Sequence, residues 1–386
     1  MTMKESRWPL MAALAVLIAH GCVVLRSGVS LSPDCVEFSR RADLLLVNHF
    51  NFAAAARAIG VHNVPAAMYM LFIAMMALAK LAAGAKWAAV IVAANLVFDA
   101  LTAAILVKLV RLATRSNAAS VLAIVAWLLC YDVVTWVRMP LTDVPFLFVS
   151  FAAFAVLVGP QLAGSKPPRK AIVAAIVLTV ISVLLRPVGF LWLILVVTTW
   201  LVLSGRVSRR SLIVAALLVA AAVFTAHTVV ARNPESWPIE TFARSVRWDA
   251  RSYRAGEVIK GRPETSHAAP SSFVDYASIT ADRFVHFFAP AAAAFSRAHK
   301  IAGVAFYGPL YLLAIAAVIA AARRDSKTAD VAILAAVVVL TVAFWHSLVV
   351  IDYDWRYRLP VLPHLMFLAA CAVPLLSREF QRSNET

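Results

Sequence analysis

The sequence predicts an all-α protein that crosses a membrane many times. Of its 386 residues, 62% are hydrophobic, and the mean hydropathy is +0.83, whereas soluble domains are roughly half apolar. Apolar runs of about span length recur along the chain, and Lys and Arg cluster in the short connections between them. Because backbone groups in lipid must form their hydrogen bonds within the chain, such spans are helical.

The charge balance fits a membrane protein better than a nucleic-acid-binding one. The net charge of +16 comes from 36 Lys and Arg against 20 Asp and Glu. The positive charges lie between apolar runs, as the positive-inside bias produces, so we expect membrane lipids and no nucleic acid as partners. No Cys/His spacing resembles a zinc site. The sequence indicates no certain cofactor and leaves open whether a divalent cation is needed.

The apolar runs predict about ten transmembrane helices. The first follows Lys4 and Arg7 and lacks a convincing cleavage site, so we interpret it as an uncleaved signal-anchor. The predicted spans lie near residues 8–25, 87–107, 119–137, 144–160, 171–185, 189–203, 211–231, 301–322, 331–350 and 361–376.

Charge parity decides the role of an eleventh apolar run, 66–83. If this run is a surface helix and the N-terminus is cytoplasmic, all the basic connections fall on the cytoplasmic side. If it spans, either those connections or Lys4 and Arg7 lie outside, and the second alternative displaces only two charges. We prefer the surface helix, and both versions leave the C-terminus cytoplasmic. The basic connections are Lys108/Arg111/Arg115, Lys166/Arg169/Lys170, Arg206/Arg209/Arg210, Arg323/Arg324/Lys327 and Arg378/Arg382.

This topology divides the chain into three parts. Residues 1–231 form a membrane core with a long first outer segment, 26–86. Residues 232–300 form a second outer segment, and residues 301–386 contain the C-terminal spans. Aromatic residues recur at helical spacing over 271–288, which predicts a helix lying in the membrane interface.

The first outer segment predicts an amphipathic helix with acids on one face. Ser32 and Pro33 are typical of a helix start, and Asp34, Glu37 and Arg41 then recur at i, i+3 and i+7. This face is turned toward protein or water, while the neighbouring stripe lies against apolar surroundings. In the alternative interpretation, the acids only favour the helix dipole. The apolar stripe consists of Cys35, Phe38, Ala42 and Leu45.

Three other outer turns carry isolated charges. Asp143 begins an otherwise uncharged span. Arg186 lies in an outer turn, where the positive-inside bias disfavours a cation, and this suggests that Arg186 has a binding partner there. Arg356 and Arg358 lie among aromatic residues at the membrane surface, an arrangement that suits a phosphate. The alternative is an aromatic belt with snorkelling arginines.

Inside the predicted spans, Asp99 is the main buried charge and a functional candidate by default. Asn95 lies one turn earlier on the same face, which favours a helix–helix hydrogen bond over a proton relay. His346, near the outer end of its span, is either a packing or a site residue.

In this order, the outer motifs resemble those of the GT-C superfamily of membrane glycosyltransferases. The nearest type is bacterial family 39, which includes aminoarabinose and rhizobial lipid A transferases. Asp34, Phe38, Ala42 and Leu45 match its D-x-x-x-Y and A-x-x-L pattern, with Phe38 where Tyr is common. The other matches are His62-Asn63-Val64-Pro65 with His-Pro-Pro-Leu, Thr142-Asp143-Val144-Pro145-Phe146 with Ser-Glu-Pro-Leu-Phe, Arg186-Pro187-Val188-Gly189 with Arg-Pro-x-Gly, and Arg356-Tyr357-Arg358-Leu359-Pro360 with R-Y-x-x-P.

The resemblance implies a GT-C-like fold and inverting transfer of a sugar from a polyprenyl-phosphate donor to a lipid or cell-surface glycan acceptor. Such a reaction needs a carboxylate to accept the acceptor's proton and cations to stabilise the departing phosphate. The Ala- and Val-rich composition favours a bacterial inner membrane, and the charge parity then makes the active face periplasmic and both termini cytoplasmic. The implied roles are Asp34 as base, Asp143 as its assistant, Glu37 as an alternative base, Arg356, Arg358 and Arg186 as phosphate ligands, and His62 and Tyr357 as substrate contacts.

Two other functions compete with this prediction. A secondary transporter usually has its polar groups at the membrane midplane, and here only Asp99 lies deep in a predicted span. A non-enzymatic assembly or flippase partner would need none of the chemistry above.

Overall fold

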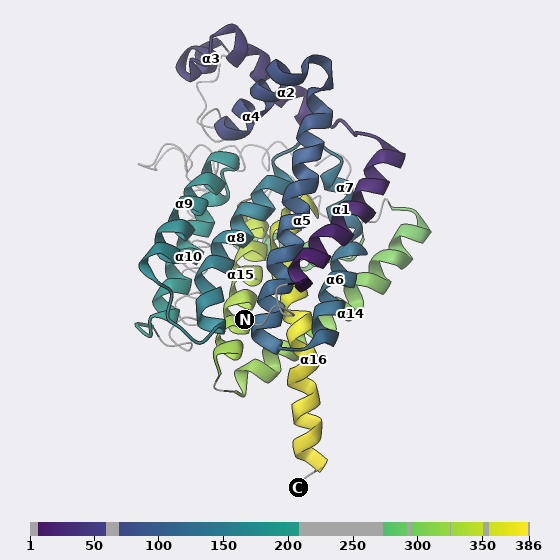
Figure 1. Ribbon diagram of the computed structural model, residues 1–386, viewed down its shortest axis with the longest axis vertical. Coiled ribbons are helices and arrows are strands. Elements are labelled where there is room, and N and C mark those ends of the chain that lie inside the picture. Colours follow the sequence, from purple (N-terminus) through teal and green to yellow (C-terminus); the bar gives the residue numbers. More distant parts are fainter. Residues whose placement is uncertain are drawn as a thin grey trace.

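The computed structural model describes residues 7–58, 69–207, 273–291, 295–324, 326–349 and 355–384, and every regular element in these ranges is helical (Figure 1). In chain order the helices are α1 (Arg7–Ser27), α2 (Pro33–Val47), α3 (Phe52–Ala58), α4 (Met70–Ala83), η2 (Gly84–Lys86), α5 (Trp87–Thr114), α6 (Asn117–Leu128), α7 (Tyr131–Val137), α8 (Asp143–Leu162), α9 (Arg169–Leu185), α10 (Gly189–Leu203), α13 (Phe273–Phe287), α14 (Arg297–Ala322), α15 (Lys327–Val349), η4 (Trp355–Val361) and α16 (Leu362–Asn384).

The helices support a polytopic membrane protein, with fewer candidate spans than the sequence predicted. Among the described residues, six helices are long and apolar enough to cross a membrane, or up to seven if a bent pair counts as one. The predicted runs 171–185 and 189–203 form α9 and α10, whose 17 and 15 residues fall short of the roughly 20 of a typical span. The predicted span 211–231 lies outside the described residues.

The predicted span 119–137 is broken. It forms α6 and α7, which are bent by 52° at a short break. Cys130 is the residue just before α7, and Asp132 lies in its first turn. The break therefore places an acidic residue at the start of a new short helix.

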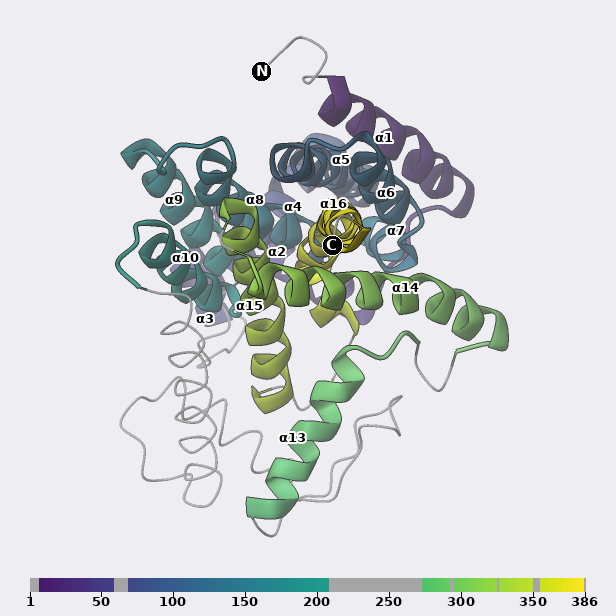
Figure 2. The same cartoon turned by 90° about the horizontal axis from the view of Figure 1, so that it is seen from below.

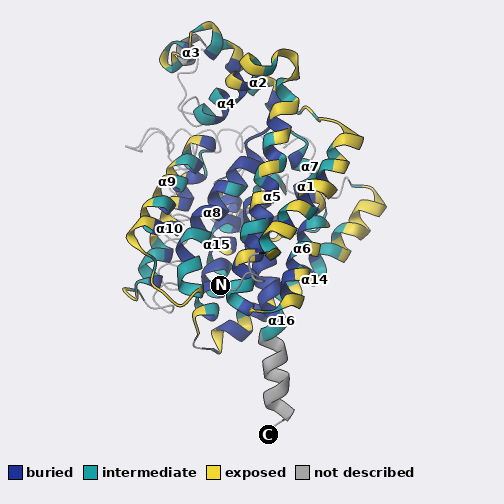
Figure 3. Ribbon diagram, viewed as in Figure 1, coloured by how far each residue is buried: buried dark blue, intermediate teal, exposed yellow. Residues whose placement is uncertain are grey.

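Burial separates central helices from peripheral ones. Of the residues in the apolar stretch that could cross a membrane, 78% are buried inside the protein in α8, against 17% in α1. Buried residues gather along α5, α8 and α16, while α1 and α14 at the edge expose much of their surface (Figure 3). Viewed along the bundle, α16 is enclosed by other helices and α13 extends outward beside α15 (Figure 2). The exposed apolar residues of the peripheral helices suit contact with lipid.

Hydrogen bonds between connections define the two ends of the bundle. At one end, Thr328 Oγ1 donates to the carbonyl of Ala113 (3.0 Å) and Lys327 Nζ to that of Gly164 (2.8 Å). These bonds join three of the basic connections. At the other end, Arg138 Nε donates to the carbonyl of Gly28 (3.0 Å), joining two connections that the charge pattern predicted to be outer. The bonds therefore group three basic connections at one end and two connections predicted to be outer at the other.

The first outer segment forms a group of short helices at this second end (Figure 1). Ser32 caps α2 by accepting a bond from the backbone amide of Cys35 (3.3 Å), and Pro33 occupies the first turn. Cys35, Ala42 and Leu45 of the predicted stripe are buried, and Phe38 contacts the ring of Phe72 on α4. The predicted amphipathic helix is confirmed.

Helix α4 covers most of the ambiguous run 66–83. It has 14 residues and ends at Gly84, whose φ of +52° is a conformation that favours glycine. Together α4 and α5 give one candidate span, over Met70–Thr114. The surface position of 66–83 stays a prediction.

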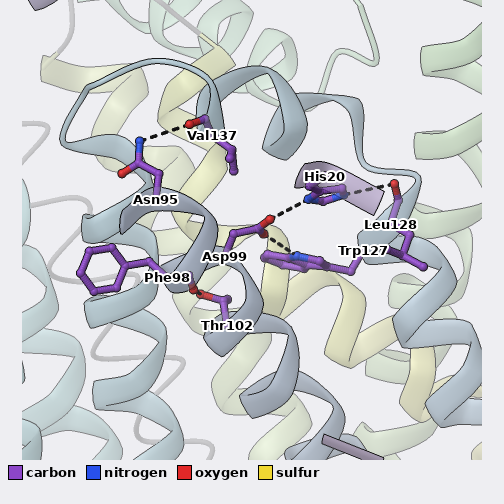
Figure 4. A network of polar contacts seen from close by, with 8 residues as sticks. All are labelled: His20, Asn95, Phe98, Asp99, Thr102, Trp127, Leu128 and Val137. Carbon is purple, nitrogen blue, oxygen red and sulfur yellow. Dashed lines mark hydrogen bonds and ion pairs between the residues drawn. The ribbon is translucent and has the colours of Figure 1, made fainter. Parts of the chain in front are cut away.

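Asp99 lies in a hydrogen-bond network that ties three helices together (Figure 4). Its carboxylate accepts a bond from Trp127 Nε1 on α6 (2.7 Å) and lies 2.6 Å from His20 Nδ1 on α1. Asn95, one turn away, donates to the carbonyl of Met139 (2.8 Å). The helix–helix hydrogen bond expected for Asp99 is therefore present.

Candidate functional site

The predicted outer charges converge on η4, the short 3-10 helix Trp355–Val361 that precedes α16. A 3-10 helix turns about 120° per residue, so side chains two positions apart point in different directions. Arg356 and Arg358 accordingly contact different acids on different helices. Tyr357, between them, stacks on His346 of α15.

Arg356 forms an ion pair with Asp34. Arg356 Nη1 donates to Asp34 Oδ2 at the start of α2. The carboxylate keeps 45% of its surface exposed and the arginine 20%. The pair is therefore reachable from outside, and it joins the first outer segment to a turn 322 residues later.

Arg186 forms a second ion pair, with Asp143, and this one is buried. Arg186 Nη1 donates to Asp143 Oδ1, and the exposed fractions of the two side chains are 9% and 3%. Local sequence shapes the turn that carries Arg186. Arg186 is extended, as expected before Pro187. Gly189 allows α10 to begin against α9, because a Cβ there would lie 2.4 Å from the backbone of Ser182.

Tyr357 lies between the two ion pairs. The guanidinium carbon of Arg186 is 5.9 Å from the centre of the Tyr357 ring, and that of Arg356 is 5.6 Å from it. The ring stacks on buried His346, with 4.5 Å between centroids and 12° between planes. Arg186 also interacts electrostatically with Arg356 and with Tyr69. Two cations and several aromatic rings therefore share one region at the end of the bundle.

Arg358 belongs to a separate, buried cluster. Its Nη2 donates to Asp132 Oδ2 (2.7 Å), and its Nη1 donates to the hydroxyl of Tyr311 (3.1 Å) and the carbonyl of Ala289 (2.7 Å). Tyr307 donates to the same carboxylate oxygen (2.5 Å), and its ring lies 3.9 Å from the guanidinium carbon. Arg358 is therefore bonded to an acid, a tyrosine and a carbonyl of the protein, while Arg186 and Arg356 both lie beside Tyr357.

Glu37 is engaged within its own helix. Arg40 and Arg41 donate to its carboxylate at 3.0 and 2.8 Å. The hydrogen bond from Arg40, followed by that from Arg41, lowers the pKa of Glu37 to about 2. Glu37 therefore forms its ion pairs with arginines of its own helix in this structure. His62 lies outside the described residues.

Asp132 is the residue that the sequence analysis missed. It lies inside the apolar run 119–137, where any acid is a functional candidate, so its position alone could have indicated it. Tyr307 and Tyr311, one turn apart on α14, gave no comparable signal because aromatic residues are common in spans.

The arrangement can bind an anion and hold a carboxylate beside it. Arg356 and Arg186 supply the positive charge, and Asp34 is the partly exposed acid next to them. Among the described residues, no group of three or more His, Cys, Asp or Glu side chains could hold a metal ion. Comparison of the chain with protein-family models, curated proteins and solved structures found no match, so the family resemblance rests on the motifs alone.

Proposed function

We propose that the protein is an integral-membrane glycosyltransferase that moves a sugar from a polyprenyl-phosphate donor to a lipid or cell-surface glycan acceptor. The observation that carries the proposal is the Asp34–Arg356 ion pair beside the Asp143–Arg186 pair, at the end of the bundle opposite the basic connections. A carboxylate and two arginines at a membrane boundary are the groups that this reaction requires.

In the proposed reaction, the donor phosphate binds Arg356 and Arg186. The acceptor hydroxyl oxygen attacks the anomeric carbon from the face opposite the phosphate, and the bond from that carbon to the phosphate oxygen breaks. The hydroxyl proton passes to the carboxylate of Asp34, and polyprenyl phosphate leaves with the electron pair of the broken bond. The configuration at the anomeric carbon is inverted.

The proposal differs from the sequence-based prediction in two residues. Arg358 is held by Asp132 and two tyrosines, so we assign phosphate binding to Arg356 and Arg186. Asp143 is buried against Arg186, so we propose that it orients this arginine. Tyr357, between the two arginines, is the proposed substrate contact.

We also propose a GT-C-like fold of about ten spans in a bacterial inner membrane. In this topology α9, α10 and the run 211–231 cross as well, which adds three crossings to the seven candidates. The basic connections are then cytoplasmic, and η4 and α2 face the periplasm. Both chain termini lie in the cytoplasm.

The transporter alternative would depend on Asp99. This carboxylate is fully buried and is already bonded to groups on two neighbouring helices. Such bonding favours a role in packing and leaves the outer charges to carry the function.

The test begins with cells that have or lack the gene. Mass spectrometry of their lipids and surface glycans identifies the sugar whose loss follows the deletion. Purified protein is then given the corresponding polyprenyl-phosphate sugar and acceptor. We expect turnover that Asp34→Asn lowers by about 100- to 10 000-fold, as loss of a general base does, and that Asp99→Asn retains. Transfer by Asp34→Asn at the wild-type rate would contradict the assignment of the base, and absence of any missing glycan would contradict the enzyme class.

A further inference from the structure

Tyr69, the residue directly before α4, lies where the first outer segment meets the proposed phosphate site. Its ring centroid is 5.0 Å from that of Phe38, with 46° between the planes, and Phe38 is one turn after Asp34 on α2. Helix α4 packs against α2 and also against α9, which Arg186 follows directly. The Tyr69 ring is therefore in contact with the helix that carries the proposed base.

The hydroxyl group of Tyr69 lies near Arg186. The guanidinium group of Arg186 interacts electrostatically with the hydroxyl groups of Tyr69 and Tyr357. Both tyrosines are partly exposed, whereas the Arg186 side chain keeps only 9% of its surface exposed. A ligand that approaches Arg186 from outside therefore meets tyrosine side chains at the surface first.

The departing phosphate gains charge during the proposed reaction, and a hydroxyl donor can stabilise that charge. In a polyprenyl-phosphate sugar the phosphate is a diester with one negative charge. When its bond to the anomeric carbon breaks, it becomes a monoester with a second negative charge. A tyrosine hydroxyl can donate a hydrogen bond to this growing charge. Because such a bond strengthens as the reaction proceeds, it speeds the chemical step more than it tightens donor binding.

We propose that Tyr69 is a further phosphate ligand, whose hydroxyl donates a hydrogen bond to the phosphate beside Arg186 and stabilises it as it departs. The inference rests on the proposed function for the identity of the phosphate ester. Phe38 supports the Tyr69 ring, and Arg186 supplies the positive charge that attracts the phosphate. The first outer segment then provides both the base, from α2, and a hydrogen-bond donor to the phosphate, from the start of α4.

Tyr69→Phe tests the hydroxyl alone, because the variant keeps the ring that lies against Phe38. Calorimetry of the full-length protein in nanodiscs measures binding of farnesyl phosphate and of farnesol, which lacks the phosphate. We expect farnesyl phosphate to bind about 10- to 100-fold more weakly, as loss of a hydrogen bond to a charged group produces, and farnesol to bind as in wild type. Unchanged affinity for farnesyl phosphate, or an equal loss for both ligands, would overturn the proposal.

Tyr131→Phe is the matched control for this measurement. It removes the hydroxyl of a tyrosine that is 56% exposed at the start of α7 and whose ring lies against His299 of α14. We expect this variant to bind both ligands as wild type does. A loss of farnesyl phosphate affinity equal to that of Tyr69→Phe would show that the effect is not specific to Tyr69 and would refute the assignment.

Sugar transfer gives a second readout, which separates a ligand of the departing phosphate from a residue that only shapes the surface. We expect Tyr69→Phe to lower kcat by about 10- to 100-fold, since the lost bond is strongest to the departing phosphate, and to raise KM for the donor much less. A raised KM with unchanged kcat would contradict the role in the departure of the phosphate.

The outcomes also distinguish this inference from the proposed function. If wild type binds farnesyl phosphate no better than farnesol, the phosphate site is refuted, and the proposed function fails together with the role of Tyr69. If wild type prefers farnesyl phosphate and Tyr69→Phe keeps the whole preference, only the assignment of Tyr69 fails. A preference that Tyr69→Phe loses, in a protein that transfers no sugar, would support the phosphate ligand and contradict the enzyme class.

Discussion

Replacing Asp34 by Asn should tighten phosphate binding while it slows sugar transfer. Arg356 is paired with Asp34 in the structure, so a phosphate and the Asp34 carboxylate would compete for one guanidinium group. An amide in place of the carboxylate removes the negative charge of the competitor. The same substitution removes the proposed base, so affinity and turnover should change in opposite directions.

The magnitude follows from the exposure of the pair. Asp34 keeps 45% of its side-chain surface exposed and Arg356 keeps 20%, so water and salt screen their attraction. Ion pairs of this kind contribute about 0.2–1 kcal/mol, which corresponds to an increase in affinity of about 1.5- to 5-fold. The gain should shrink as salt is added.

The assay is calorimetric titration of farnesyl phosphate into wild type and Asp34→Asn in nanodiscs at two salt concentrations. Glu37→Gln is the matched control, because it removes the same charge from the same helix, one turn further on, where Arg40 and Arg41 hold the acid. Weaker binding in Asp34→Asn would show that Asp34 orients Arg356 and does not compete for the ligand. Equal tightening in Glu37→Gln would show a general charge effect and refute the competition.

Three further substitutions have expected outcomes. Glu37→Gln should leave the pH–rate profile above pH 5 unchanged, because the pKa of Glu37 is lowered to about 2. The small contribution of the Glu37 ion pairs to stability is present above the unfolded pKa near 4.5. It is lost as the pH falls toward 2. Gly189→Ala should lower the free energy of unfolding by about 1–3 kcal/mol and weaken farnesyl phosphate binding, since a Cβ at this position would displace the backbone that carries Arg186. Thermal unfolding and calorimetry measure the two effects. Gly21→Ala is the control, because the Cβ added there meets nothing within 4 Å. Asp99→Asn should lower stability by about 1–3 kcal/mol through its lost hydrogen bonds and leave binding per folded molecule unchanged in the same assays.

The sequence predicted the helices well, and it predicted that Asp34 and Arg356 lie at the same end of the bundle. It did not predict which acid pairs with which arginine. Apolar periodicity was enough for α2, whose stripe of Cys35, Ala42 and Leu45 is buried as expected. Charge parity was enough to bring Asp34 and Arg356 to the same end of the bundle. Neither indicates which acid meets which arginine, because partners hundreds of residues apart are set by helix packing.

Two local features escaped prediction for physical reasons. The break between α6 and α7 contains no Gly or Pro at its centre, so nothing in the run 119–137 indicated a bend. The residues before α16 were interpreted as one cluster at the membrane surface, whereas η4 is a 3-10 helix that sends Arg356 and Arg358 to different sides. Charged side chains two positions apart on a 3-10 helix point in different directions.

Exposure distinguishes the roles of the three acids better than their motifs do. Arg186, Arg356 and Arg358 each have a carboxylate partner, as a cation in a region of low dielectric constant requires. Asp143 and Asp132 are 3% and 11% exposed, so withdrawing either would leave a buried arginine unpaired at a high free-energy cost. Asp34, at 45%, can give up its arginine to a phosphate because water solvates the released carboxylate. That same release leaves the carboxylate free to accept a proton, and for this reason we assign the base to Asp34 and the fixed counterions to the other two.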